Sequence, residues 1–362
     1  MKIYLVGGAI RDKLLGRVPK EKDWVVVDSS SSELLNLGYK QVGKQFPVFL
    51  HPETSEEYAL ARLEKKTDTG HKGFIFETHK GVTLEQDLLR RDISINAIAE
   101  DSNGKLIDPY NGIEDIENRV IRHVSIAFAE DPLRIYRVAR FYATLSEYDF
   151  KIHESTYELM REIVNSGEME QLSKERLWME FSKAFNTKNP WMFFEVLINT
   201  SAAKKYYPEI IDNDLIKKKI EYFSNSDIEK DIFLSIIGFS VNFLEIFGFP
   251  KKTVNLYFIF NEFITRFISL ELNEENILDF TNSLDAFRRP DRLKIFLKQA
   301  VYFFEFHKMQ DNKKFSIFLE LIKVIEDKID YGDLKNKSVE DIKKNVENIN
   351  LNIIKLVLSN KN

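Results

Sequence analysis

The first apolar run of the chain, Ile3–Val6, has the length of a single strand and stops at two glycines. Residues 9–15 then follow a helical pattern that Gly16 closes. A second apolar run, Trp24–Val27, shows no alternation with polar residues, which is typical of a strand covered on both faces. Because glycine tolerates sharp turns and lets a ligand approach the backbone closely, the order of strand, glycine pair and helix predicts an anion-binding turn.

Three further patterns predict elements downstream. Residues 83–86 read Thr-Leu-Glu-Gln, a capping-box pattern that begins a short helix ahead of Arg90. A turn at residues 102–104 predicts a hairpin between residues 96–99 and 106–107. Ser173 is expected to cap another helix, in which Arg176 pairs with an acidic residue.

Helical spacing dominates from Asp131 onward, and the most instructive helix runs from Asp131 to Leu145. Its apolar stripe consists of Ile135, Val138, Ala139, Tyr142 and Leu145. Arg137 and Arg140 occupy the opposite side, with Arg134 at its edge. A solvated face is the simplest explanation, with Glu130 and Arg134 forming an i, i+4 pair worth about 0.3–0.5 kcal/mol. Solvated faces usually mix charges, however, so three arginines on one side favour a functional role.

The chain changes character along its length and predicts a multi-domain α+β protein. Residues 1–125 mix short apolar runs with turns and predict an α/β head, whereas glycine becomes sparse beyond them. We assign successive helical segments to residues 126–190 (neck), 191–270 (body) and 271–362 (tail). The breakers at the expected joints are Pro190, Pro208, Pro250 and Pro290.

Composition excludes several classes of function. The 362-residue chain contains no cysteine, so disulfides and thiolate metal sites are impossible. Its formal net charge of −5 argues against a protein that coats nucleic acid by bulk attraction. No apolar run is long enough for a bilayer, and the N-terminus opens into a strand rather than a signal peptide. We therefore expect a cytoplasmic protein with no membrane partner.

Two groups near the N-terminus carry the candidate chemistry. Gly8 lies where backbone N–H groups can face an anion, and Arg11 can grip phosphate oxygens with its forked guanidinium. Glu21 and Asp23 are two residues apart on an extended segment, so their carboxylates leave the same face. Because two carboxylates repel unless a cation lies between them, this pair predicts a Mg²⁺ site. Metal-binding carboxylates beside a phosphate grip are typical of phosphoryl transfer.

These motifs resemble the class II tRNA nucleotidyltransferases, the CCA-adding enzymes of gammaproteobacterial type, within the tRNA nucleotidyltransferase/poly(A) polymerase family. The likeness is close and ordered from residue 1 to about residue 200. The segments that carry it are Gly7–Asp12, Glu21–Val27, Phe46–Pro52, Glu57–Arg62, Arg90–Ala97, Asp108–Gly112 and Glu130–Phe141.

The resemblance implies an activity: addition of C, C and A to the 3′ end of tRNA, from CTP and ATP with Mg²⁺, releasing pyrophosphate. It also implies a mobile loop over residues 65–81 that helps position the nucleotide, and tRNA contact by the tail, for which Arg288 and Arg289 are candidates. The residues that match the family's site are Glu21 and Asp23 for catalysis and metal, Gly8, Arg11 and Arg91 for the triphosphate, and Asp131, Arg134, Arg137 and Arg140 for the base and sugar.

Hydrogen-bonding chemistry explains how Asp131 and Arg134 could select bases. Cytosine and adenine both present an amino group beside an unprotonated ring nitrogen, so a carboxylate accepts from the amine while a guanidinium donates to the nitrogen. Uracil and guanine reverse both groups. Because an unpaired buried charge costs about 3–5 kcal/mol, one acid–arginine pair could accept C and A and reject U and G.

Two features depart from the family pattern. The first metal carboxylate is more often Asp than Glu, as at Glu21, and Glu57 is only a weak candidate for a third carboxylate. Longer relatives carry a His-Asp phosphohydrolase domain after the neck, but this chain has no histidine between residues 154 and 306 and no His-Asp doublet. We therefore expect the phosphohydrolase site to be missing and residues 191–270 to be its remnant.

Three alternatives remain open. A bacterial poly(A) polymerase shares the head motifs and extends a different RNA. An enzyme that adds only A, or only C and C, would be a specialised variant. A tRNA-binding protein without catalysis would fit Glu21 and the reduced C-terminal half. In each case we expect a monomer.

Overall fold

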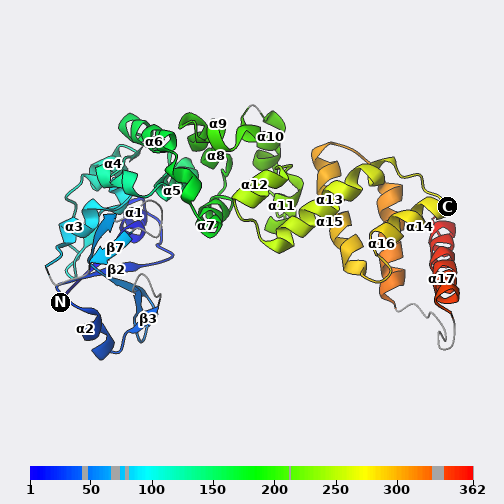
Figure 1. Ribbon diagram of the computed structural model, residues 1–362, viewed down its shortest axis with the longest axis horizontal. Helices are drawn as coiled ribbons and strands as arrows, with labels where there is room; N and C mark the ends of the chain where they lie inside the picture. Colours follow the sequence, from blue (N-terminus) through cyan, green and yellow to red (C-terminus); the bar gives the residue numbers. More distant parts are fainter. Residues whose placement is uncertain (43–47, 67–73, 78–80, 212, 328–337, 362) are drawn as a thin grey trace. The chain divides into compact units, whose positions relative to one another are not determined.

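The computed structural model describes residues 1–42, 48–66, 74–77, 81–211, 213–327 and 338–361. They form two compact units, the first made of residues 1–217 and 241–248 and the second of residues 218–240 and 249–362. The first unit contains the main sheet, and helices make up most of the rest (Figure 1). This arrangement confirms the predicted α+β class, with a sheet-containing head followed by helices, while the division into four segments stays a prediction.

The strands are β1 (Lys2–Val6), β2 (Asp23–Val27), β3 (Lys40–Val42), β4 (Val48–Leu50), β5 (Glu57–Leu60), β6 (Leu63–Lys66), β7 (Phe74–Glu77), β8 (Ala99–Glu100), β9 (Leu106–Ile107), β10 (Val120–Ile121) and β11 (Lys151–Ile152). The α-helices up to residue 223 are α1 (Gly8–Leu14), α2 (Ser31–Asn36), α3 (Leu84–Leu89), α4 (Gly112–Glu117), α5 (Leu133–Leu145), α6 (Glu154–Ser166), α7 (Lys174–Ala184), α8 (Trp191–Asn199), α9 (Ala202–Tyr206) and α10 (Asp214–Phe223). Those that follow are α11 (Lys230–Ile236), α12 (Val241–Ile246), α13 (Lys251–Ser269), α14 (Glu274–Ser283), α15 (Pro290–Phe306), α16 (Asn312–Glu326) and α17 (Val339–Ser359).

The main sheet has the strand order β3-β4-β5-β2-β1-β8-β9. Strand β2 is central: it pairs antiparallel with β1 and parallel with β5. The predicted hairpin is confirmed, since β8 pairs antiparallel with β9, although residues 94–96 form a short 3₁₀ helix (η2) instead of strand. Because β2 lies between β1 and β5, the segment that carries Asp23 is held on both sides.

The segment 65–81, expected to be a loop, contains regular structure. Strands β6 and β7 pair antiparallel, from Leu63 opposite Glu77 to Lys66 opposite Phe74. The expectation of an irregular loop is therefore wrong for residues 65–66 and 74–77, because the two strands satisfy each other's backbone groups. Residues 67–73 and 78–80, which include Gly70 and Gly73, lie outside the described part of the chain.

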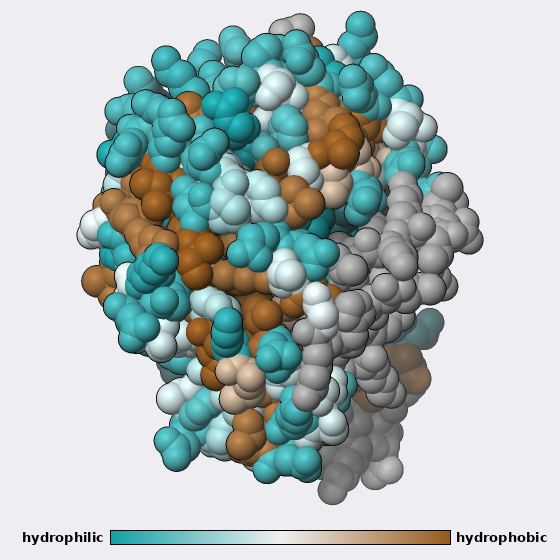
Figure 2. All heavy atoms as spheres, turned by 90° about the vertical axis from the view of Figure 1, so that its left-hand side faces the viewer, coloured by the Kyte–Doolittle hydropathy of each residue, from teal (hydrophilic) through white to brown (hydrophobic). Residues whose placement is uncertain are grey.

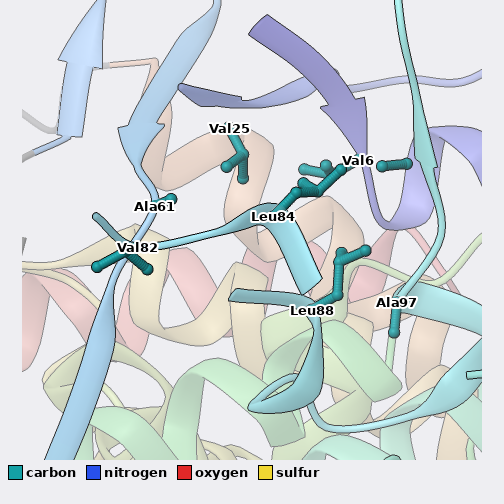
Figure 3. Close-up of a cluster of buried hydrophobic side chains, with 8 residues drawn as sticks. Val6, Val25, Ala61, Val82, Leu84, Leu88 and Ala97 are labelled. Atoms are coloured by element: carbon teal, nitrogen blue, oxygen red, sulfur yellow. The ribbon is translucent and has the colours of Figure 1, made fainter. Parts of the chain in front are cut away.

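Both faces of β2 are covered, as its apolar sequence predicts. Val25 and Val26 point to opposite faces and are 3% and 1% exposed. Val25 packs on the face that α3 covers, in the cluster that Figure 3 shows, where Leu84 and Leu88 of α3 approach the sheet. The capping box that begins α3 is present in full at Thr83, so this helix starts where the sequence predicts. Its packing fixes the place of the two arginines that follow it.

An aromatic cluster forms the core of the helical part of the first unit. The Phe181 ring centroid lies 4.3 Å from that of Phe185 and 4.9 Å from that of Phe247. Tyr136 of α5 is buried among these helices and its hydroxyl hydrogen-bonds the Tyr207 hydroxyl. Since aromatic pairs of this kind contribute beyond their buried area, the cluster anchors α5 and α7 against α8.

The second unit has its own phenylalanine core. Phe267 of α13 contacts the rings of Phe280, Phe296 and Phe318. Phe260, Phe296 and Phe304 of this unit are also buried, whereas Phe303 and Phe306 are partly buried and Phe258 is 49% exposed. No helix in the described ranges is long and apolar enough to cross a membrane. Apolar and hydrophilic side chains are intermixed on the face that Figure 2 shows.

Candidate active site

A cavity of about 700 Å³ opens in the first unit. Its wall comes from the turn before α1, strands β2 and β5, the end of α3, and helices α5 and α7. The described cationic side chains that line it are Arg11, Arg62, Arg90, Arg91, Arg134, Arg137, Arg140, Arg176 and Lys183. The described carboxylates are Glu21, Asp23, Glu57, Asp87, Asp92 and Asp131. A protein of net charge −5 therefore presents a local excess of cations here, which favours an anionic ligand.

The glycine turn lies against an arginine. Gly7 has φ +73°, in the left-handed region, and its N–H donates to the Ile98 carbonyl at 3.2 Å. A Cβ at this position would lie 3.0 Å from Nη1 of Arg91. Glycine alone adopts a positive φ at no steric cost and leaves the space beside Arg91 open. Gly8, the predicted phosphate contact, begins α1 and lines the cavity.

The two predicted metal carboxylates line the same cavity. Asp23 begins β2 and Glu21 precedes the strand by two residues. Burial raises the pKa of the Asp23 carboxyl; Arg91 lowers it in part, and the like charge of Glu21 raises it further. Neither carboxylate forms an ion pair with a described residue, because the neighbouring arginines bind other acids.

This donor set fits a hard divalent cation. Magnesium takes oxygen ligands and is often bound through one or two carboxylates plus substrate phosphates. Two neighbouring carboxylates without a cationic partner are the protein's share of such a site. Among the described residues, no group of three or more histidines, cysteines, aspartates or glutamates is arranged as a complete metal site. Glu21 and Asp23 would therefore hold Mg²⁺ together with substrate oxygens.

Arg11 lies in the cavity wall, but its guanidinium is largely engaged. It donates through Nη1 to the Asn96 side chain at 2.8 Å and through Nε and Nη2 to Asp12 at 3.1 and 2.9 Å. It is 7% exposed. The free forked grip expected from the sequence is thus already bound by protein groups, so a phosphate contact by Arg11 remains a prediction that uses its remaining N–H bonds.

Arg91 is held beside the Gly7 turn by two contacts. Its Nη1 donates to the Asn96 carbonyl at 3.3 Å and its Nη2 to Asp87 at 3.3 Å. Both contacts are long, and its buried Nε has no hydrogen-bond partner among the described residues. Its two Nη groups each keep a second N–H beside Gly7, and the phosphate contact expected of Arg91 stays a prediction.

Arg134 does not lie on a solvated face, which was the simplest explanation that the sequence offered. It is 7% exposed, and its guanidinium donates to the carbonyls of Ala127 at 2.8 Å and Arg90 at 2.7 Å. The base-reading role that the resemblance implies for it stays a prediction. Helices α7 and α8 pack on α5 and leave little of it exposed, which a single apolar stripe does not reveal. Tyr142, placed in that stripe, is only partly buried.

Asp131 pairs with an arginine from another helix. Arg176 of α7 donates through Nη2 to Oδ2 at 2.7 Å and through Nη1 to Oδ1 at 3.3 Å. This confirms the expectation that Arg176 pairs with an acid and that Ser173 caps α7, since the Ser173 hydroxyl accepts from the Arg176 backbone N–H. The explanation by a solvated face would have paired Arg134 with Glu130, but the guanidinium donates to two backbone carbonyls.

Arg137 and Arg140 belong to an ion-pair network under the cavity. Arg137 donates to Asp92 through Nε at 2.7 Å, and Arg140 donates to Glu180 of α7. The Arg140 guanidinium also lies 4.0 Å from the Phe141 ring centroid, a cation–π distance. Both arginines also line the cavity, and their predicted contact with the nucleotide stays a prediction.

Asp92 is the buried centre of this network. It is 5% exposed and accepts from Arg137, from its neighbour's backbone N–H and from the Asn96 amide. Burial alone would raise its pKa, but the Arg137 charge and hydrogen bond lower it to about 2. The carboxylate is therefore ionised at neutral pH and joins the end of α3 to α5.

Sequence reasoning gave no role to Asn96, Glu180 or Phe141. Asn96 links Arg11 to Asp92, and Glu180 bridges Arg137 and Arg140. The only signal for Glu180 was its position one turn beyond Arg176, on the same face of a capped helix. Asn96 lay within a segment that carried the family resemblance, but nothing in its spacing pointed to a bridging amide.

Comparisons with known proteins agree with this geometry. Residues 3–122 match the family model described as poly A polymerase head domain, and residues 149–213 match a probable RNA- and SrmB-binding site of polymerase A. The multifunctional CCA protein of Haemophilus influenzae (strain PittGG) is 57% identical over 190 residues. That alignment covers 52% of this chain and 46% of the relative, so the chain matches about half of the curated protein's length.

Solved structures share the fold. A CCA-adding enzyme in complex with CTP matches 99% of this chain and 90% of its own, with TM-score 0.64 and 22% identity. The Thermotoga maritima CCA-adding enzyme complexed with tRNA matches 99% of this chain and 91% of its own, with TM-score 0.63 and 20% identity. The fold is thus that of the CCA-adding enzymes of known structure, and residues 3–122 match the head-domain family of poly A polymerases. The curated relative and the solved structures named above are CCA-adding proteins.

Proposed function

We propose that this chain adds C, C and A, without a template, to the 3′ end of tRNA from CTP and ATP, and releases pyrophosphate. One observation supports this most strongly. The carboxylates proposed to bind the metal, Glu21 and Asp23, line the same cavity as the glycine turn proposed to bind phosphate and as Asp131, the carboxylate proposed to read the base. The curated relative is a CCA protein, and the similar structures include complexes with CTP, ATP and tRNA.

The triphosphate would lie against the glycine turn. Gly8 would present its backbone N–H, and Arg91 would donate through the remaining N–H bonds of its Nη groups. Lys183, from α7, lines the cavity and forms no ion pair with a described residue, so its charge is available to a phosphate. Cationic side chains outnumber carboxylates in the cavity wall, so the cavity is electrostatically complementary to a ligand with several negative charges.

Transfer would occur beside Glu21 and Asp23. When bound, Mg²⁺ would supply activation of the attacking hydroxyl and stabilisation of the leaving pyrophosphate. A bond would form between the 3′ oxygen of the tRNA and the α-phosphorus of the nucleotide, while the bond to pyrophosphate breaks and the proton of the 3′ hydroxyl passes to solvent. The two carboxylates would hold and orient the cation, and Arg91 beside them would neutralise phosphate charge.

The base would be read at the start of α5. Asp131 would accept from the amino group that cytosine and adenine share. The ring-nitrogen contact predicted for Arg134 stays a proposal, since that guanidinium is engaged by two backbone carbonyls. Arg137 and Arg140 would contact the nucleotide from the side of the cavity opposite their acids.

A gel assay tests the proposed function. The purified chain is incubated with Mg²⁺, a tRNA transcript lacking its terminal CCA, and labelled triphosphates singly and together. We expect three added residues and then arrest. A ladder of A would support a poly(A) polymerase, one or two residues would support a partial enzyme, and no product would support a tRNA-binding protein. We expect the active species to be a monomer in the cytoplasm. Sedimentation with and without tRNA measures its oligomeric state.

A further inference from the structure

The carboxylate of Asp131 is held by three donors in this structure. Oδ1 accepts from the Leu133 backbone N–H at 3.1 Å and from Nη1 of Arg176 at 3.3 Å. Oδ2 accepts from Nη2 of Arg176 at 2.7 Å. Both side chains line the cavity, and each is 20% exposed, so the pair is open to a ligand without being free to move in solvent.

We propose that Arg176 is a specificity-determining positioning residue: it fixes Asp131 in the orientation that accepts the amino group of the incoming base. This inference rests on the proposed function. Arg176 acts through Asp131 and not on the reacting phosphate.

The hydrogen-bond inventory leaves one place for the base. An ionised carboxylate offers about four acceptor sites. The three donors described above use two sites on Oδ1 and one on Oδ2, so one site on Oδ2 is open. One amino group of cytosine or adenine can occupy that site while Arg176 stays bound. Uracil and guanine present a carbonyl instead and meet a carboxylate that cannot turn away.

The planar guanidinium explains why the orientation is fixed. Two N–H bonds from one arginine to both oxygens of a carboxylate set the plane of the carboxylate as well as its position. A single donor would leave it free to rotate about its bond to Cβ. The backbone N–H of Leu133 alone is such a single donor, so Arg176 supplies the constraint.

Helix α7 gives Arg176 a rigid base. Arg176 lies in the first turn of the helix, where the Ser173 hydroxyl accepts from its backbone N–H at 3.4 Å. One turn further, the buried Glu180 binds Arg140 of α5. The helix is thus tied to α5 at two levels, so the position of Asp131 depends on the packing of α7 and not on a flexible loop.

Substitution of Arg176 with glutamine tests the proposal. We expect R176Q to lower the ratio of kcat/KM for CTP to that for UTP about ten-fold, at the low end of what a charge-assisted hydrogen bond contributes. R176K, which keeps the charge but not the fork, should lie between R176Q and the unaltered protein. The matched control is R122Q, since Arg122 binds Asp115 at 3.2 Å away from the cavity. R122Q should leave the ratio unchanged.

A double variant separates positioning from a structural effect. If Arg176 acts only through Asp131, adding R176Q to D131A changes the CTP/UTP ratio no further, whereas two independent effects would multiply. An unchanged ratio in both R176Q and R176K, or a further change in the D131A background, would overturn the inference. The proposed function fails separately, if the unaltered chain incorporates neither C nor A.

Discussion

Asp23 of β2 lies directly opposite Glu57 of β5 in the parallel ladder that joins the two strands. Paired residues of neighbouring strands point to the same face of a sheet, so the two carboxylates emerge side by side. Glu57 also lines the cavity. The pairing makes Glu57 a stronger candidate for the third carboxylate than the sequence suggested. The sequence alone could not show this, because the length of the stretch between β2 and β5 does not reveal their register.

The carboxylates should differ in importance. We expect D23A to lose at least a hundred-fold in kcat at ordinary Mg²⁺, because oriented electrostatic stabilisation of this kind is worth about 10²–10³ in rate. E21D should be tolerated, since it restores the commoner residue of the family pattern. E57Q should lie between them and recover with added Mg²⁺. Single-turnover incorporation of CMP at several Mg²⁺ concentrations measures all three, and full activity of D23A would contradict the assignment.

Gly7 should tolerate no side chain. In G7A the new methyl group lies 3.0 Å from Nη1 of Arg91 and the backbone is strained at φ +73°. We therefore expect a raised KM for CTP through displacement of the arginine.

Gly16 provides the matched control for that strain. It has φ +71°, but a Cβ at this position would meet no atom within 4 Å, so G16A carries the backbone strain alone. Strain of this kind costs of order 1–3 kcal/mol. Equal effects of G7A and G16A on KM would show that the contact with Arg91 is unimportant.

Arg134 should matter more for stability than the sequence suggested. R134M leaves the carbonyls of Ala127 and Arg90 without their donor, and an unsatisfied buried group costs about 1–3 kcal/mol. We expect a lower free energy of unfolding, measured by urea denaturation, together with reduced transfer of both C and A. The exposed arginine of the Arg161–Glu154 pair serves as the control, since R161M should change stability little. Normal stability with relaxed base choice in R134M would instead favour the original base-reading role.

Asp92 should make the first unit sensitive to acid. Its pKa in the folded protein is about 2, below the usual value of 3.8, so the folded state binds fewer protons than the unfolded state. The resulting stability is fully present above about pH 4 and is lost as the pH falls through about 2; linkage gives about 2 kcal/mol. The stability gap between the unaltered protein and D92N should therefore narrow between pH 5 and pH 2.5. A constant gap across that range would contradict the ion pair with Arg137.

Local signals in the sequence predicted most of the elements that build the site. The apolar run of β2, the capping box at Thr83 and the cap at Ser173 each act over a few residues, so they can be recognised from the chain alone. What could not be predicted depends on tertiary packing. Arg134 and Arg137 are both arginines of helix α5. Arg134 nevertheless binds backbone carbonyls, whereas Arg137 binds a buried acid 45 residues away in the sequence. Only the folded positions of residues 90–92, Ala127 and α7 beside α5 decide which partner each arginine meets.

Intact-mass measurement of a tRNA transcript lacking CCA, incubated with the chain, CTP, ATP and Mg²⁺, tests the nucleotidyl transfer proposed for this cavity. We expect the mass to rise by two C residues and one A residue and then to stay constant, and not to change with D23A. A transcript whose mass stays unchanged with the unaltered chain, or rises equally with D23A, would contradict the assignment of Asp23 and of this cavity as the catalytic centre.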